Sequence, residues 1–148
     1  MVHLERCLLQ RVAICAAAAA LLACKGNASE VPLSDLLPNP ELVEHISIFN
    51  GGGNPMADIY APVSPDIQAD SALFRRLQAA ISDTRAQQQK CYLSRAVWAI
   101  MFYDSSGQPI GGVGVTGRCA EVSGPKGGTY VLSGRLLGFL QRLKTQIR

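Results

Sequence analysis

Two apolar runs separated by a polar turn mark the middle of the chain. Residues 96–103 read Ala-Val-Trp-Ala-Ile-Met-Phe-Tyr, residues 104–107 are polar and end in glycine, and residues 110–116 are again mostly apolar. This order is typical of a β-hairpin. Both faces of the first run are apolar, which predicts a central strand covered by a helix on one side and by a second element on the other.

The second run is rich in glycine, which weakens a strand unless the fold needs the space. It contains Gly111, Gly112 and Gly114, and Gly117 follows it. We expect these glycines to make room for the large rings of Trp98 and Phe102 on the neighbouring strand.

Two cysteines lie almost symmetrically about the turn of this hairpin, at Cys91 and Cys119. Directly opposed residues of an antiparallel pair have Cα atoms about 4.5–5.5 Å apart, which is a separation that a disulfide can span. The spacing therefore predicts a Cys91–Cys119 disulfide that staples a central hairpin.

Helical periodicity appears once before the hairpin and once at the end of the chain. The apolar positions of the first stripe are Leu73, Phe74, Leu77, Ala80 and Ile81, and those of the second are Leu136, Leu140, Leu143 and Ile147. Ser133 is the predicted N-cap of the second helix. Residues 42–49 fit a helix or a strand, and we take one helical turn followed by a strand at residues 45–49. Further strands are expected at residues 56–61 and 129–132.

Together these elements predict a single α+β domain over residues 42–148. We expect an antiparallel sheet of about four to five strands with two helices and one disulfide-stapled central hairpin. Residues 25–40 are polar and contain three prolines. They predict a semi-extended tether that reaches about 50 Å.

The first 23 residues have the pattern of an export signal. Arg6 and Arg11 precede an apolar run from Val12 to Ala23. A helix of that length reaches about 18 Å, short of the roughly 30 Å hydrocarbon core of a bilayer. A signal peptide over residues 1–23 is therefore favoured over a permanent membrane span.

The apolar run ends in Leu21-Leu22-Ala23-Cys24, which resembles the lipobox of bacterial lipoproteins. The resemblance implies that Cys24 becomes the lipidated first residue of the mature chain, so residues 24–41 would form a lipidated N-terminus and tether. Lys25 stands where an aspartate would imply retention in the inner membrane, so the resemblance implies an outer-membrane, periplasm-facing protein. The alternative is an ordinary signal peptide and a soluble periplasmic or secreted product.

Charge is distributed unevenly along the chain. Residues 25–70 contain one lysine and seven acidic residues, whereas residues 71–148 contain eleven basic and three acidic residues. Such asymmetry can indicate an acidic partner for the C-terminal half. The interpretation we favour is that the two halves attract each other and that the remaining charges are solvated.

Catalytic patterns are weak in this sequence. Ser123-Gly-Pro-Lys126 matches the S-x-x-K string of penicillin-binding enzymes, but its glycine and proline predict a turn where that chemistry needs a helix. His45 is the only histidine after residue 23, and the acidic residues are scattered. A metal site, a serine triad or a carboxylate pair is therefore not predicted. We expect a protein that is not an enzyme, with no cofactor, no bound metal and no nucleic-acid partner.

Export, a lipid anchor and a small stapled domain favour a protein-binding module in the cell envelope. An inhibitor or immunity protein against an envelope-targeting hydrolase or toxin has this outline, which is similar to that of small lipoproteins that inhibit lysozymes. A scaffold or assembly lipoprotein of an outer-membrane or secretion complex is the alternative. Tyrosine and arginine commonly anchor interfaces. The candidate partner-binding residues are therefore Tyr60, Tyr92, Arg118 and Tyr130, of which Tyr130 fits a core position as easily.

Overall fold

A computed structural model describes residues 29–51, 61–93 and 97–146. Its helices are α2 (Ala72–Ser82) and α3 (Leu136–Gln146), and two short 3-10 turns are η1 (Leu33–Asp35) and η2 (Pro40–Leu42). Its strands are β1 (Glu30–Pro32), β2 (His45–Asn50), β3 (Ala61–Gln68), β4 (Thr84–Gln88), β5 (Trp98–Tyr103), β6 (Pro109–Thr116), β7 (Cys119–Ser123) and β8 (Gly128–Gly134).

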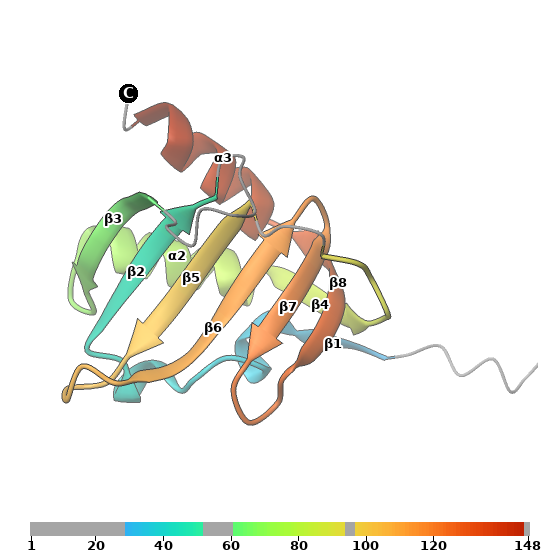
Figure 1. The fold of residues 1–148 in the computed structure, drawn as a ribbon, viewed down its shortest axis with the longest axis horizontal. Coiled ribbons are helices and arrows are strands. Elements are labelled where there is room, and N and C mark those ends of the chain that lie inside the picture. Colours follow the sequence, from blue (N-terminus) through green and yellow to red (C-terminus); the bar gives the residue numbers. More distant parts are fainter. Residues whose placement is uncertain (1–28, 52–60, 94–96, 147–148) are drawn as a thin grey trace, which may run out of the picture.

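All these strands form one antiparallel sheet in the order β1-β4-β8-β7-β6-β5-β2-β3 (Figure 1). The α+β class and the two helices are confirmed, but the predicted number of strands is too low. The sequence Thr-Arg-Ala-Gln-Gln of β4 has few apolar residues, because β4 buries only Thr84 and Ala86. Ala120 and Val122 of β7 do alternate with polar residues, and this pattern was not assigned to a strand.

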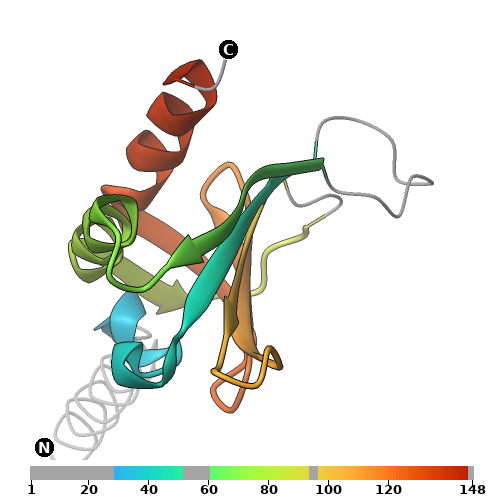
Figure 2. The same cartoon turned by 90° about the vertical axis from the view of Figure 1, so that its left-hand side faces the viewer.

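Both helices cover the same face of the sheet, as Figure 2 shows. The strands direct alternate apolar side chains toward that face, so each strand contributes one row to a single core. On the sheet side this core contains Ile46, Ile48, Trp98, Ile100, Phe102, Val113, Val115, Ala120, Val122, Tyr130 and Leu132. Within the described residues, no helix has the length and the apolar composition that a membrane span requires.

The last helix does not start where the sequence suggested. Ser133 lies in β8, opposite Arg85, so its predicted role as an N-cap is wrong. The helix begins at Leu136, whose backbone N–H donates to the hydroxyl oxygen of Thr84 at 3.1 Å. Thr84 is 1% exposed and also donates to the carbonyl oxygen of Ala80 at 2.7 Å. One buried hydroxyl therefore connects the end of α2 to the start of α3.

Much of the predicted tether belongs to the folded domain. Residues 30–32 pair with β4, and the Leu33 side chain is completely buried. Leu36 and Leu37 pack against the same core. The boundary at residue 42 is therefore wrong, because the apolar side chains between the prolines cover one end of the helical layer and residues from Glu30 onward belong to the domain.

The glycines of β6 fit the prediction only in part. Trp98 lies opposite Val115, so its ring needs no glycine across the pair, whereas Phe102 does lie opposite Gly111. A Cβ atom on Gly111 would lie 2.7 Å from Cγ of Pro38, in the N-terminal segment. The lack of a side chain at Gly111 therefore allows the segment before β2 to pack closely against β6 at Pro38.

Candidate binding surface at the disulfide

The predicted disulfide is present, and it follows a different route from the predicted one. Cys91 and Cys119 are bonded, with their Cα atoms 5.9 Å apart. Cys119 starts β7, where it pairs with Thr116 and Val131. Cys91 lies in the connection after β4, so the two cysteines do not face each other across one hairpin. The bond joins that connection to the sheet.

The described start of this connection, residues 89–93, lies on the face of the sheet that the helices leave open. It follows β4, which is second in the sheet order, and precedes β5, which is sixth. Figure 1 shows its described part in front of the sheet, and Figure 2 shows it on the side away from the helices. The expected second cover over β5 is not found among the described residues, because Ala99, Met101 and Tyr103 remain partly exposed.

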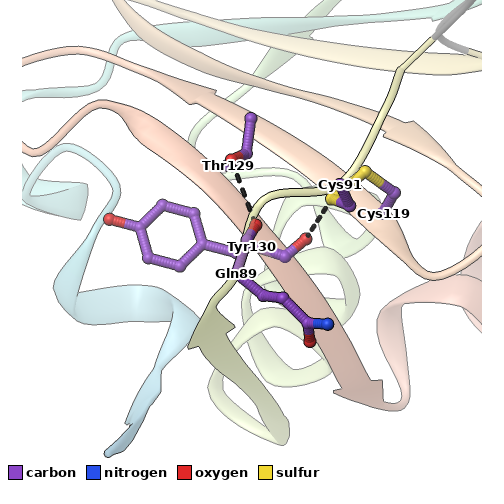
Figure 3. The surroundings of a disulfide bond; sticks show 5 residues. All are labelled: Gln89, Cys91, Cys119, Thr129 and Tyr130. Atoms are coloured by element: carbon purple, nitrogen blue, oxygen red, sulfur yellow. Dashed lines mark hydrogen bonds between the residues drawn. A yellow bond between two sulfur atoms is a disulfide. The ribbon is translucent and has the colours of Figure 1, made fainter. Parts of the chain in front are cut away.

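Several contacts fix the start of this connection on β8 (Figure 3). The backbone N–H of Gln89 donates to the carbonyl oxygen of Thr129 at 3.2 Å, and the Thr129 hydroxyl donates to the carbonyl oxygen of Gln89 at 3.1 Å. Cys91 Sγ lies 3.3 Å from the carbonyl oxygen of Tyr130. An oxidised sulfur carries no proton, so this last contact is one of packing. Hydrogen bonds at Gln89 and the disulfide at Cys91 therefore hold this segment against the sheet.

Two predicted interface residues meet at this point. Tyr92 follows Cys91 directly and is 90% exposed, whereas Arg118 precedes Cys119 and is exposed at the β6–β7 turn. The disulfide therefore brings them to the same end of the sheet. We call this surface the turn end; it comprises Tyr92, Val97, Gly117, Arg118 and the Cys91–Cys119 bond.

Arg118 is held in place by β8. Its carbonyl oxygen accepts from the backbone N–H of Leu132 at 2.7 Å, and its Nε donates to the Leu132 carbonyl oxygen at 3.2 Å. Among the ion pairs of the described residues, none includes Arg118. Its side chain is therefore oriented by a neutral partner and keeps its charge available at the surface.

A small apolar pocket of about 300 Å³ opens beside Arg118. The α3 helix supplies one wall, through Leu137 and Gln141, and another consists of Val97 and Trp98, where β5 begins. Val97 is 39% exposed there. The residues lining the pocket are Val97, Trp98, Val115, Gly117, Arg118, Leu137 and Gln141.

Arg118 was predicted from the sequence as a partner-binding residue, but the pocket beside it was not. Leu137 and Gln141 are one helical turn apart on the side of α3 that flanks its main apolar stripe. The apolar stripe of α3 does not include either residue, so the period of the helix gave no signal for this wall.

The remaining predicted residues are placed differently. Tyr130 is 7% exposed, and its hydroxyl donates to the carbonyl oxygen of Lys126 at 3.2 Å, so of its two interpretations the core position is the one observed. Tyr60 and Cys24 lie outside the described residues. The Ser123–Lys126 segment forms the predicted turn, and Lys126 Nζ donates to the carbonyl oxygen of Asp35 at 2.8 Å.

The side chains of His45 and Asp104 are involved in structural contacts. The rings of His45 and Tyr103 stack at 4.7 Å, and His45 Nε2 lies 3.8 Å from Asp66 Oδ1. A hydrogen bond from the Ser106 hydroxyl, with backbone N–H groups of the same turn, lowers the pKa of Asp104. In residues 29–51, 61–93 and 97–146 no group of three or more His, Cys, Asp or Glu side chains is placed to hold a metal ion.

Comparison of this chain with known protein families, with characterised proteins and with solved structures gives no match.

Proposed function

We propose that this protein is an exported lipoprotein whose folded domain binds another protein, without catalysis, through the turn end. The observation that carries the proposal is the placement of Tyr92. Its side chain is 90% exposed, although it lies next to a disulfide that anchors the backbone to the sheet. A large aromatic side chain that is exposed on a fixed backbone is a typical anchor of a protein interface.

The turn end is suited to binding because its backbone and the Arg118 side chain are already ordered before a partner binds. The disulfide fixes the backbone on the Tyr92 side, and hydrogen bonds to Leu132 fix Arg118 on the other. Ordering a side chain at an interface costs about 0.5–1.5 kcal/mol for each flexible side chain. A surface that is ordered in advance avoids part of this cost.

Two features support an exported protein. Disulfides persist in oxidising compartments and are rare in the cytosol, and the leader ends in the lipobox-like Cys24. If Cys24 is lipidated, the first strand begins six positions later, at Glu30, and six steps of extended chain reach about 20 Å. The domain would then lie close to the outer membrane, with the turn end exposed to periplasmic partners.

Site-specific crosslinking in cells tests the binding surface. A photoreactive phenylalanine analogue replaces Tyr92 in one strain and Leu42 in another. Leu42 is a matched control, because it is 64% exposed and lies beside the β5–β6 turn, at the other end of β6 from Arg118. We expect a discrete crosslinked product from position 92 that is absent from position 42 and lost in Arg118→Glu. Absence of a product at position 92 would contradict the proposal.

The identity of the crosslinked protein separates the two classes of partner. A hydrolase or a toxin supports an inhibitor or immunity protein, whereas a component of an outer-membrane or secretion complex supports a scaffold. The anchor has its own test, in which labelled palmitate is incorporated into the protein and lost in Cys24→Ala. Label retained in that variant would refute the lipid site.

A further inference from the structure

We infer that the pocket beside Arg118 binds the C-terminal residue of the partner protein, with an apolar side chain in the pocket and the free α-carboxylate on Arg118. This inference rests on the proposed function, because it assigns the chemistry of the partner at the turn end. It follows from the composition of the pocket, the charge at its edge and its size.

The walls of the pocket favour an apolar group. Trp98 and Val115 line it and are 6% and 1% exposed, so they belong to the core. Val97 and Leu137 are partly exposed beside them. An apolar side chain placed here would remove these surfaces from water, which contributes about 25 cal/mol per Å² of apolar area.

The edge of the pocket favours an anion. Among the described residues that line it, Arg118 is the only charged one. A guanidinium has five N–H donors in a fixed fork, and Nε of Arg118 uses one of them on Leu132. The terminal nitrogens suit the two parallel hydrogen bonds that a carboxylate accepts. An apolar group beside a carboxylate is therefore the complementary ligand.

The size of the pocket favours a chain end over an internal acidic residue. Its volume of about 300 Å³ is at the lower limit for ligand sites. In an extended peptide, neighbouring side chains point to opposite sides, and side chains on the same side are about 6.6 Å apart. A C-terminal residue carries its carboxylate and its side chain on one Cα atom, so both reach a single small pocket. Recognition of a C-terminal carboxylate is a known mode of peptide binding.

Backbone amide NMR of the purified chain, with its disulfide intact, tests this with acetyl-Gly-Gly-Leu as the probe. We expect saturable shifts at Gly117, Arg118 and Leu137 for the peptide with a free carboxylate. The matching peptide with a C-terminal amide should bind at least about tenfold more weakly, since it lacks the charge. Equal binding of the two peptides, or no saturable shift up to about 10 mM, would overturn the inference.

Two variants and one peptide locate the ligand. Arg118→Gln should reduce binding of the free acid to the level of the amide, and acetyl-Gly-Gly-Gly should bind more weakly than the leucine peptide. Leu42→Asp is the control for Val97→Asp, and only the second should abolish binding. If position 92 crosslinks a partner but neither peptide binds, the inference fails and the proposed function stands. If no partner is crosslinked, the proposed function fails whatever the peptides do.

Discussion

The hydroxyl oxygen of Thr84 accepts a hydrogen bond from the backbone N–H of Leu136, from the first residue of α3, at 3.1 Å. The same hydroxyl donates to the carbonyl oxygen of Ala80, in the last turn of α2, at 2.7 Å. The first N–H groups of a helix have no partner within the helix. A side chain from β4 therefore caps α3 and ties both helices to the sheet.

Replacing Thr84 by valine tests this connection. Valine keeps the shape but leaves the N–H of Leu136 buried without a partner, and an unsatisfied buried group costs about 1–3 kcal/mol. We expect Thr84→Val to lower the free energy of unfolding in urea by that amount. Thr129→Val is the control, because Thr129 bonds Gln89 at an exposed position, and its loss should cost less. Equal effects of the two substitutions would contradict the capping role.

Removal of the disulfide should weaken the fold and release the turn end. The bond joins residues 28 positions apart, and a loop of that size corresponds to about 3–4 kcal/mol in the chain-entropy model. We expect Cys91→Ser/Cys119→Ser to lower the free energy of unfolding by that amount, and thiol counting to find both cysteines blocked in the unreduced protein. Two free thiols in protein purified without reductant would contradict the bond.

The same substitution should affect the surface more than the core. The sheet keeps its strand pairing without the bond, whereas the segment around Tyr92 loses its covalent anchor. We therefore expect hydrogen exchange to rise at Tyr92 and to change little at Ile100 and Val113, which lie opposite each other in the centre of the sheet.

Local patterns predicted much of the fold from the sequence. The alternation in β5, the turn after it and the apolar stripes of both helices indicated the class, because each depends on neighbours within a few positions. The cap of α3 could not be predicted in this way, because Thr84 and Leu136 are 52 positions apart. Strand β4 also gave little signal, since it buries only Thr84 and Ala86 and its Arg85 and Gln88 are exposed.

The binding surface was predicted only in its individual residues. Tyr92 and Arg118 were named as residue types that favour interfaces, and pairing of the cysteines next to them was predicted correctly. Tyr92 and Arg118 lie at the same end of the sheet because of the path of the chain after β4 and the disulfide there. Periodicity along the sequence gives no information about that path. Tyr130 lies in the core instead, because alternation along β8 directs its ring there.

The β5–β6 turn provides a test of pH dependence. Asp104 Oδ1 accepts hydrogen bonds from the Ser106 hydroxyl at 2.6 Å and from the Ser106 and Gln108 backbone N–H groups. These bonds favour the ionised carboxylate and lower the pKa of Asp104 below its usual value of 3.8. The stabilisation is present above the pKa of the unfolded chain and is lost as the pH falls through the lower pKa of the folded state.

An NMR titration of the Asp104 carboxyl carbon checks this prediction. The pKa should lie below 3.8 in the native protein and rise in Ser106→Ala, since the Ser106 hydroxyl is the largest cause of the shift. Ser105→Ala, in the same turn, should leave the pKa of Asp104 unchanged, because no hydrogen bond to Asp104 involves its hydroxyl. A pKa that does not respond to Ser106→Ala would show that the backbone donors alone hold the carboxylate.

Gly134 and Gly107 provide a matched pair for the junction between β8 and α3. Both have positive φ, at +132° and +78°, and side chains other than glycine rarely adopt such angles. A Cβ atom on Gly134 would overlap the carbonyl oxygen of Asp83 and lie 2.7 Å from Cα of Thr84, whereas nothing lies within 4 Å of a Cβ on Gly107.

Alanine at the two positions should therefore separate backbone strain from overlap. Gly107→Ala is expected to cost about 1–2 kcal/mol, from the left-handed conformation alone. Gly134→Ala adds a collision with backbone that cannot rotate away, and we expect at least about 3 kcal/mol in urea unfolding. Because the collision lies where β4 pairs with β8, Gly134→Ala should also separate Thr84 from Leu136. Combined with Thr84→Val it should cost less than the two substitutions added together. Additive effects would mean that the glycine and the threonine support the junction independently.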